Sequence, residues 1–384
     1  MRVRFMLIAA ALLLLLPGVI FSAGSREAAE PAPDIMADED FDYETLVRLA
    51  QQEGKLTVTD TSSRIVPVAE AFAEKYGIEV SGTKMGNPEQ ITRTRREVDA
   101  GNVLTDVIGI ASGPELINDL IPNNYVINWV PPNMRDVIPE DFQYPLTYRI
   151  MQRIFGYNTG AYDESPITNI WELTEPQWKN KVMLRDPATT TDHISFFATL
   201  TRDDYASQLA DAYKAHYGTD LVTTEENAGW EWLKRFFANE PITFGSDGDV
   251  GDAVGAPGQT DPPVGLYNYT KHRDIERQGL ELGVMFDLIP FIGYVETTHV
   301  AIVNGAPNPH AARLYVHFLM TEEGVGQWTM RDIGGYSPNP QVGTHPDDEL
   351  GSFDAWAPFL VNPDGKLYWT LQEQILDMWM LSRQ

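Results

Sequence analysis

The strongest constraint on the fold of this chain is a regular alternation of short apolar strands and amphipathic helices near its start. Apolar and β-branched residues predict strands at 55–59, 78–80 and 106–110. Between these strands, residues 66–76 have the 3.6-residue spacing of a helix with one buried face. Residues 87–100 are predicted to be a polar helix, because Asn87-Pro88-Glu89 provides a cap with Pro in the first turn. Because parallel strands are joined by crossover helices, this alternation predicts an α/β fold with a parallel sheet covered by helices.

The chain of 384 residues is longer than one ordinary hydrophobic core requires, so we expect two lobes. Long extended segments at 148–157 and 297–303 are predicted to be strands that cross between the lobes. We expect a first lobe at 41–150, a second lobe at 151–295, and a return strand with C-terminal helices at 296–384. Further strands are predicted at 181–184, 263–267 and 283–289, and further helices at 42–53, 114–120, 170–173, 194–200, 228–238, 271–278, 311–320 and 371–381.

Residues 1–25 have the composition of a secretory signal peptide. Two arginines precede an apolar run at 5–16, and small residues at 22–25 provide a cleavage site. A single anchoring helix is the alternative, because the apolar stretch is near the lower length limit for spanning a membrane. Residues 26–40 are rich in Ala, Glu, Asp and Pro, and we interpret them as a flexible acidic spacer.

The residue composition excludes several classes of function. The chain has no cysteine, which excludes disulfides, zinc–thiolate sites, thiol nucleophiles and attachment as a cysteine-anchored lipoprotein. Its net charge of −27 opposes nucleic-acid binding, which needs clustered Lys and Arg. A surface adapted to a salty habitat explains this charge at least as well as a cationic ligand does.

No enzyme motif is found. The chain lacks a Gly-x-Ser-x-Gly elbow, a His-Glu-x-x-His helix, a P-loop and a dinucleotide-binding glycine motif. Residues 245–258 resemble a calcium loop in composition, but they lack the spacing and closing glutamate of an EF-hand, so we interpret them as a loop and short helix. We therefore predict that the protein is not an enzyme and has no cofactor.

One stretch of the chain resembles a known protein family. It contains Tyr157-Asn158-Thr159, the short helix Ile170-Trp171-Glu172-Leu173, Pro176-Gln177-Trp178, the strand Lys181–Leu184 and the pair Asp186-Pro187. This order resembles the iron-type, ferric-binding-protein-like branch of the bacterial extracellular solute-binding proteins that serve ABC importers. A second segment matches the family approximately, with Val300–Val303, Asn308-Pro309, Ala311-Ala312, Phe318-Leu319 and Glu322–Gly324 followed by Gln327. Together the matches cover roughly residues 54 to 340.

The resemblance implies a type II periplasmic-binding fold, with two parallel-sheet lobes joined by a hinge of crossing strands and the ligand held between them. It implies a receptor in the periplasm that delivers a small solute to an ABC permease in the inner membrane. We expect a monomer. A ligand-sensing partner of a membrane receptor is an alternative, because both roles use the same fold.

Polar residues at three strand-to-helix junctions are candidate ligand contacts, because solutes bind beyond the carboxyl ends of parallel strands. Hydroxyls and free backbone N–H groups at a helix start favour a small oxygen-rich organic or phosphorylated anion. Ser, Thr and Asp are also the preferred helix caps, and capping is the favoured interpretation of any single junction. Since three junctions face one cleft, we expect at least one to contact the ligand. The candidates are Thr61, Ser62 and Ser63; Ser112 and Gly113; and Thr189, Thr190, Thr191 and Asp192.

Tyr267 and Tyr269 form the fourth candidate site. Ferric-iron receptors of the family place two adjacent tyrosines here, and phenolate oxygen is a hard ligand that suits Fe³⁺. In this chain Asn268 separates them. They would point the same way in an extended segment but diverge by about 200° in a helix. Ferric iron is therefore the alternative ligand, and the favoured interpretation is that one tyrosine packs while the other lines the pocket.

The remaining aromatic and histidine residues are interpreted as structural. His193 is predicted to be exposed near a helix cap, and His299 to be a structural residue in a crossing strand. Trp171, Trp178, Trp230 and Trp232 are predicted to pack in the core or on a lobe surface and not to stack on a sugar.

Overall fold

The computed structural model of the protein describes residues 41–383. The predicted signal peptide at 1–25 and the predicted spacer at 26–40 lie outside the described residues. Within 41–383, no helix combines the length and the apolar character needed to cross a membrane.

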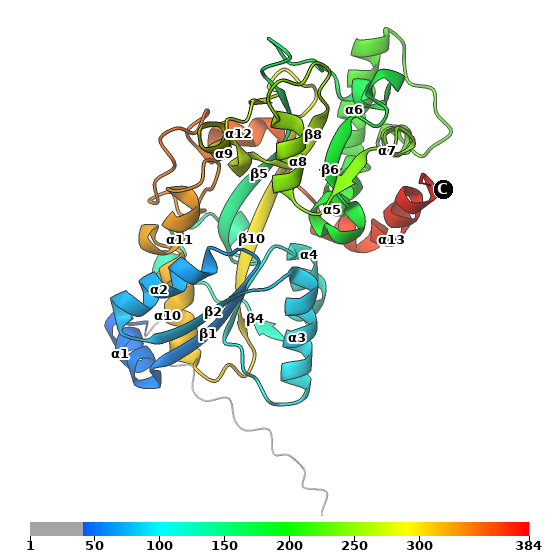
Figure 1. The fold of residues 1–384 in the computed structure, drawn as a ribbon. Coiled ribbons are helices and arrows are strands. Elements are labelled where there is room, and N and C mark those ends of the chain that lie inside the picture. The colour runs from blue at the N-terminus through cyan, green and yellow to red at the C-terminus, as the bar shows by residue number, and fades with distance from the viewer. Residues whose placement is uncertain (1–40, 384) are drawn as a thin grey trace, which may run out of the picture. The chain divides into compact units, whose positions relative to one another are not determined.

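The first lobe contains the predicted alternation of strands and helices (Figure 1). Strand β1 (Lys55–Asp60) lies between β2 (Glu79–Lys84) and β3 (Val107–Ile110), and all three are parallel. Helices α2 (Ile65–Tyr76) and α3 (Asn87–Asp99) connect them. The prediction of a parallel sheet covered by helices is therefore confirmed for this part of the chain.

Two long strands connect the lobes. Strands β5 (Thr147–Asn158) and β10 (Gly293–Val303) pair with each other in antiparallel register. At one end β10 pairs antiparallel with β3, and at the other end β5 pairs antiparallel with β8 (Val264–Asn268). The strands consequently form one mixed sheet in the order β2-β1-β3-β10-β5-β8-β6-β7, and the predicted hinge of crossing strands is its middle.

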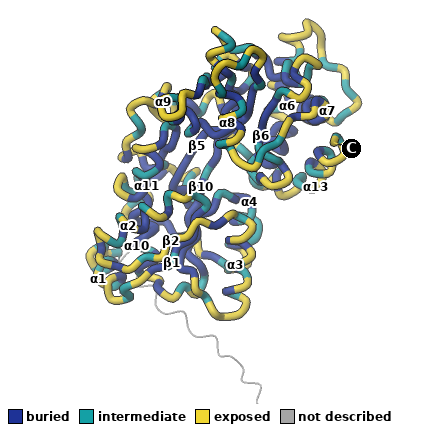
Figure 2. The backbone as a smooth tube through the Cα atoms, viewed as in Figure 1, coloured by how far each residue is buried: buried dark blue, intermediate teal, exposed yellow. Residues whose placement is uncertain are grey.

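The second lobe repeats the parallel arrangement. Strand β6 (Val182–Arg185) lies between β8 and β7 (Ile242–Phe244). Helix α7 (Ala228–Ala238) begins at Asn227, whose side chain accepts hydrogen bonds from the first backbone N–H groups, as a helix cap should. Trp171, Trp178, Trp230 and Trp232 are all buried in this lobe, as predicted. Figure 2 shows the central strands β5 and β10 as buried segments.

Tryptophan packing explains why the most recognisable stretch of the sequence is structural. Trp171 and Trp232 are fully buried, and each indole N–H donates to a backbone carbonyl, on Leu209 and Ile170 respectively. A buried indole needs such an acceptor, because an unpaired N–H in the core is costly. The two tryptophans therefore hold the short helix at 170–174 against α6 (Asp203–Tyr217) and α7.

The C-terminal helix is longer than predicted. Helix α13 begins at Gly365 after the capping side chain of Asp364 and runs to Leu381, where the sequence predicted residues 371–381. It packs against α5 (Thr191–Leu200) in the second lobe and also contacts α4 (Gly113–Glu115) in the first. Helix α6, which the sequence did not predict, covers residues Asp203–Tyr217.

The other elements are short helices, 3-10 and π turns and edge strands. They are α1 (Tyr43–Glu53), η2 (Leu116–Leu120), β4 (Val126–Ile127), η3 (Pro132–Met134), η4 (Glu140–Phe142), η5 (Ile170–Thr174), η6 (Pro176–Trp178), η7 (Pro187–Thr189), α8 (Asp247–Gly255), η8 (Tyr269–Arg273), α9 (Asp274–Gln278), β9 (Leu282–Val284), α10 (Pro309–Leu319), α11 (Glu322–Thr329), α12 (Phe353–Trp356), η9 (Ala357–Phe359) and β11 (Leu360–Val361).

Candidate functional site

A cleft of about 600 Å³ lies between the two lobes, with the crossing strands as its floor. The first lobe contributes the turn after β1 and the start of α3, at residues 61–64 and 86–88. The second lobe contributes the segments that lead into α5 and α8 and the segment that follows β8. Every one of these segments follows the carboxyl end of a strand or opens a helix, which is where ligands bind in open parallel sheets.

The structure brings six of the predicted contact residues into this cleft and leaves five outside it. Thr61, Ser62 and Ser63 line it from the first lobe, and Thr189, Thr191 and Asp192 line it from the second. Ser112, Gly113, Thr190, Tyr267 and Tyr269 are not among its lining residues. Ser112 and Thr190 are almost completely buried, and Gly113 lines a smaller neighbouring cavity.

The two tyrosines lie away from the cleft. Tyr267 is fully buried, and its hydroxyl packs over Gly156 of the neighbouring strand, where a Cβ atom would come within 2.2 Å of that oxygen. Tyr269 is 1% exposed and packs against Trp356. Burial raises the pKa of both phenols, so neither is poised to ionise. The expectation that one of them lines the ligand pocket is therefore not met by this geometry.

Nor do other residues supply a metal centre. Within residues 41–383, no group of three or more His, Asp or Glu side chains is arranged to hold a metal ion.

The predicted exposure of His193 is wrong. Its side chain is fully buried, and its Nδ1 lies 2.8 Å from the hydroxyl of Tyr294. Burial and the nearby guanidinium groups lower its pKa well below the usual value, so the ring stays neutral. The helix start at 191 turns this residue inward because α5 is buried along nearly its whole length.

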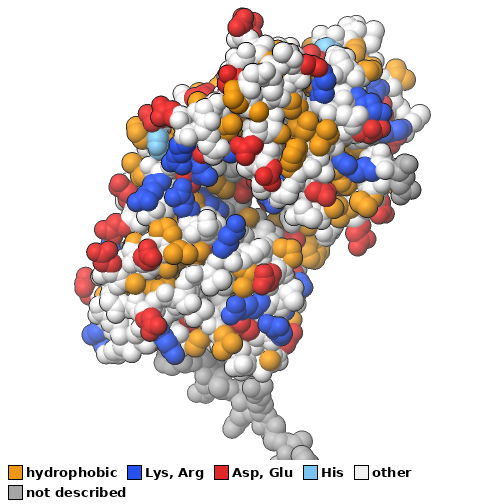
Figure 3. All heavy atoms as spheres, viewed as in Figure 1, with side chains coloured by type: hydrophobic (Ala, Val, Ile, Leu, Met, Phe, Trp, Pro, Cys, Tyr) orange, Lys and Arg blue, Asp and Glu red, His pale blue; other side chains and the backbone are white. Residues whose placement is uncertain are grey.

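The cleft is cationic although the protein is strongly acidic. Seven Lys and Arg side chains line it, against five carboxylates, whereas the whole chain has 28 basic and 55 acidic residues. In Figure 3, blue side chains gather beside the hollow between the lobes. The cationic residues are Arg64, Lys84, Arg149, Arg153, Arg185, Lys271 and Arg273. The carboxylates are Asp192, Asp247, Asp274, Glu296 and Asp332.

Arg153 on β5 is neutralised by protein carboxylates. Its side chain is 2% exposed and forms ion pairs with Asp247 and with Glu296, the latter at 2.8 Å. Asp192 lies 4.0 Å from the same guanidinium. Burial opposes ionisation of Glu296, but the arginines outweigh it and lower its pKa, while burial and the Glu296 charge raise the pKa of Asp192. Arg153 therefore holds the site together and has little charge left for a ligand.

Arg149 differs from Arg153 although it lies only four residues before it on the same strand. It is 5% exposed, and no described carboxylate forms an ion pair with it. Its Nε and Nη2 donate to the hydroxyl of Thr298 at 3.2 and 2.8 Å, and its guanidinium lies 5.1 Å from the ring centre of Trp328. A guanidinium has five N–H donors, so three remain without an acceptor among the described residues. Such a buried cation is costly unless an anion joins it.

One carboxylate joins the two lobes at the side of the cleft. Asp332 accepts from Arg64 of the first lobe at 2.5 Å and pairs with Arg273 of the second lobe at 2.7 Å. Lys271 is similarly paired, with Asp252 and Asp274. These cations are partly neutralised, and Arg185 pairs with Asp247 at 3.6 Å. Arg149 and the exposed Lys84 are therefore the cations most open to a ligand.

Sequence reasoning missed the arginines of the cleft. Arg149 and Arg153 stand four residues apart in a segment predicted to be a buried crossing strand, together with Met151 between them. Charged residues at even spacing in an otherwise buried strand lie on one face. That pattern could have identified the two arginines as candidate site residues, because an arginine is rarely buried in a strand unless a partner or a ligand pairs with it.

The fold is similar to that of solved periplasmic binding proteins. Iron-bound HitA from Pseudomonas aeruginosa aligns with a TM-score of 0.63 at 17% identity, over 84% of this chain and 99% of that chain. AfuA from Actinobacillus pleuropneumoniae, with exogenous fructose-6-phosphate bound, aligns with a TM-score of 0.63 at 19% identity, over 86% and 98%. The Trichodesmium protein IdiA (FutA), in complex with iron and citrate, aligns at 0.62 and 17%, over 86% and 99%. At these identities the likeness shows the fold alone.

The sequence itself identifies the family. No protein with curated function matches the chain. Residues 68–350 match the family described as bacterial extracellular solute-binding protein, which is more than half of the chain. The chain therefore belongs to the bacterial extracellular solute-binding proteins, as its motifs predicted. It is a solute-binding receptor of an ABC importer, and it is not an enzyme.

Proposed function

We propose that the protein captures a small, oxygen-rich organic or phosphorylated anion between its lobes and delivers it to an ABC permease in the inner membrane. It would act in the periplasm as a monomer. The single observation that carries the choice of an anion is Arg149, a buried guanidinium in the floor of the cleft with three unused donors and no carboxylate partner among the described residues.

The rest of the cleft supports the same ligand class. Hydroxyls of Thr61, Ser63 and Thr191 line it from both lobes, and they would supplement the cations as hydrogen-bond donors. Its volume of about 600 Å³ suits a small organic molecule. Planar guanidinium groups bind carboxylate and phosphate oxygens in pairs, which favours these two anions over halides.

The two-lobed fold suggests how the receptor would deliver its solute to the permease. A ligand that contacts Thr61 in the first lobe and Thr191 in the second favours the closed arrangement, because it gains both sets of contacts only when the lobes approach. A permease could then distinguish the loaded receptor from the empty one by the lobe positions.

Ferric iron is the weaker candidate. HitA and IdiA (FutA) are structures with iron bound, and they share this fold. In the present chain both candidate tyrosines are buried away from the cleft. AfuA, whose structure holds fructose-6-phosphate, has the same fold and a bound solute that carries a phosphate.

Isothermal titration calorimetry with inorganic phosphate, glycerol 3-phosphate, citrate and neutral glycerol tests the proposal. We expect at least one anion to bind, its affinity to fall as sodium chloride is raised, and glycerol not to bind. Native mass spectrometry of protein purified without denaturation would give the mass of any retained solute. Retention or binding of a neutral or cationic solute, with no response to anions, would overturn the anion proposal.

A further inference from the structure

Asp332 brings two cleft arginines from opposite lobes onto a single oxygen atom. Its Oδ1 accepts a hydrogen bond from Arg64 at 2.5 Å and pairs with Arg273 at 2.7 Å. Arg64 immediately precedes α2 in the first lobe, whereas Arg273 ends η8 in the second. Because both guanidinium groups approach the same atom, they lie close together, and the carboxylate between them offsets the repulsion of their like charges.

This arrangement is an anion-binding position that the protein fills with its own side chain. All three residues line the cleft, so the position faces the ligand space. The Asp332 side chain is 6% exposed, whereas those of Arg64 and Arg273 are 26% and 31% exposed. Guanidinium groups bind the carboxylates and phosphates of ligands through the same N–H donors that Asp332 engages here. Asp332 therefore takes the place that an anionic group of a ligand would take.

Asp332 is the principal counter-ion of both arginines. Arg64 has no second ion pair within residues 41–383. Arg273 has one, with Asp274, but its length is 3.9 Å, and Asp274 is also held by Lys271 at 2.9 Å. Without the charge of Asp332, the cleft would therefore present two neighbouring guanidinium groups to a solute.

The filled position neighbours Arg149, the buried guanidinium that has no carboxylate in ion-pair contact. Trp328, whose ring centre lies 5.1 Å from the guanidinium of Arg149, stands four residues before Asp332. Four residues of chain span at most about 14 Å, and both side chains line the cleft. One small solute in this space can therefore approach both positions.

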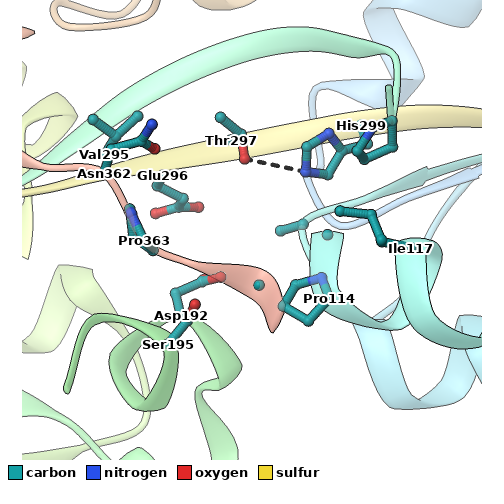
Figure 4. A pocket seen from close by; sticks show the side chains of 14 residues that line it. Pro114, Ile117, Asp192, Ser195, Val295, Glu296, Thr297, His299, Asn362 and Pro363 are labelled. Atoms are coloured by element: carbon teal, nitrogen blue, oxygen red, sulfur yellow. Dashed lines mark hydrogen bonds between the residues drawn. The ribbon is translucent and has the colours of Figure 1, made fainter. Parts of the chain in front are cut away.

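A smaller cavity beside β10 offers no other place for a second anionic group. Its volume is about 120 Å³, and Figure 4 shows Pro114 and Ile117 on one side of it and Pro363 on the other. Its charged lining residues are Asp192 and Glu296, and no Lys or Arg of the described chain lines it. A second anionic group of a bound solute would therefore find no cation there.

We propose that Asp332 is a specificity residue, which fills a second anion-binding position and so restricts the receptor to solutes with one anionic group. The inference rests on the proposed function, in which that group binds at Arg149. A second carboxylate or phosphate would have to displace Asp332 from Arg64 and Arg273 or lie beside it, and like charges in contact repel. The ligand class is accordingly a small monophosphate or monocarboxylate whose remaining groups are neutral.

Two esters of matched size test this inference by titration calorimetry. Glycerol 3-phosphate has one anionic group, whereas 3-phosphoglycerate has a carboxylate in place of the terminal hydroxymethyl group. We expect the wild type to bind glycerol 3-phosphate at least about 10-fold more tightly, because like charges brought together are costly. Asp332→Asn should shift the ratio of the two affinities toward 3-phosphoglycerate roughly 10- to 100-fold, because the added carboxylate then gains hydrogen bonds from the freed arginines.

A second variant and a matched control accompany this test. Asp332→Ser removes the charge and also makes room for the carboxylate of the ligand, so it should shift the ratio in the same direction. The control is Asp252→Asn, which removes a carboxylate from Lys271, a cleft cation that keeps its pair with Asp274. Asp252 does not line the cleft, and its substitution should leave the ratio unchanged. Since each variant is judged by a ratio, a general loss of stability does not imitate the effect.

Two kinds of result would overturn the inference, and they differ. If the wild type prefers 3-phosphoglycerate or citrate to glycerol 3-phosphate, or if Asp332→Asn changes both ester affinities by the same factor, the specificity role is wrong and the proposed function stands. If neither ester, inorganic phosphate nor citrate binds any of these proteins while a neutral or cationic solute does, the proposed function is wrong, and the inference is lost with it.

Discussion

The contrast between Arg149 and Arg153 offers the sharpest test of the site, because two buried arginines on one strand should respond in opposite ways to the same substitution. Arg149 has a hydroxyl and an aromatic ring as partners, whereas Arg153 is held by Asp247 and Glu296. Removing one partner of a buried charge network leaves the others uncompensated. Removing a charge that has no ion pair relieves its desolvation and loses only its longer-range attraction to Asp60 and Glu296.

The magnitudes follow from these partners. Arg153→Met leaves two buried carboxylates without their cation, which should cost about 3–5 kcal/mol of unfolding free energy. At an unfolding entropy of about 2.1 cal/mol/K per residue, a chain of this size should lose roughly 4–7 °C in melting temperature. Arg149→Met loses the hydrogen bonds to Thr298 and a cation–π contact of about 1–2 kcal/mol, but it also removes an unpaired buried charge. We therefore expect a much smaller change in the melting temperature of the ligand-free protein.

Ligand affinity should show the reverse order. If an anion binds Arg149, truncating that side chain should cost about 2–5 kcal/mol of binding free energy, which is at least a 30-fold loss of affinity. Differential scanning fluorimetry and titration calorimetry on both variants measure the two quantities with glycerol 3-phosphate or the retained solute. An Arg149→Met protein that binds as tightly as the wild type, or that is destabilised as much as Arg153→Met, would refute this assignment.

Two further predictions concern buried titratable groups. Protein mixed with Fe³⁺ and bicarbonate should remain colourless, because Tyr267 and Tyr269 are buried with raised pKa values; a tyrosinate charge-transfer band absent from a Tyr267→Phe variant would contradict this. Burial lowers the pKa of both His299 and His317 to about 4, below the unfolded value of about 6.5. Stability should therefore fall as pH drops from about 6.5 to about 4, by up to about 3 kcal/mol for each ring. Urea unfolding at several pH values, with His317→Gln as the comparison, measures this slope, and equal slopes in both proteins would argue against it.

Much of the fold was predictable because its signals are local. The strand at 55–59, the helix at 66–76 and the glycine that ends it are encoded by spacing and by a left-handed cap at Gly77. The union of the two lobes in one sheet was not predictable, since it depends on pairs such as Gly293 with Ile154, which are far apart in sequence. Local periodicity carries no information on such partners.

The site was predictable only where its residues stand at element boundaries. Thr61 and Thr191 follow the carboxyl ends of predicted strands, and the structure places both in the cleft. Tyr267 follows the same rule but packs inward, because Gly156 on the adjacent strand leaves room for its hydroxyl. Arg149 lies within strand β5, so a search for polar residues at strand ends does not find it. Its role as a candidate ligand contact can be inferred only once its hydrogen-bond partners are known.

The net charge of the protein does not indicate the charge of its cleft. Fifty of the 55 acidic residues do not line the cleft, while a quarter of the 28 basic residues do. Ions screen exposed charges over about 8–10 Å at physiological salt, so a ligand inside the cleft experiences mainly the groups that line it. The value of −27 therefore says little about the ligand. A salt-adapted surface, which the composition left as a competing explanation, accounts for the excess carboxylates without reference to binding. The cations that remain are concentrated where an anion would need them.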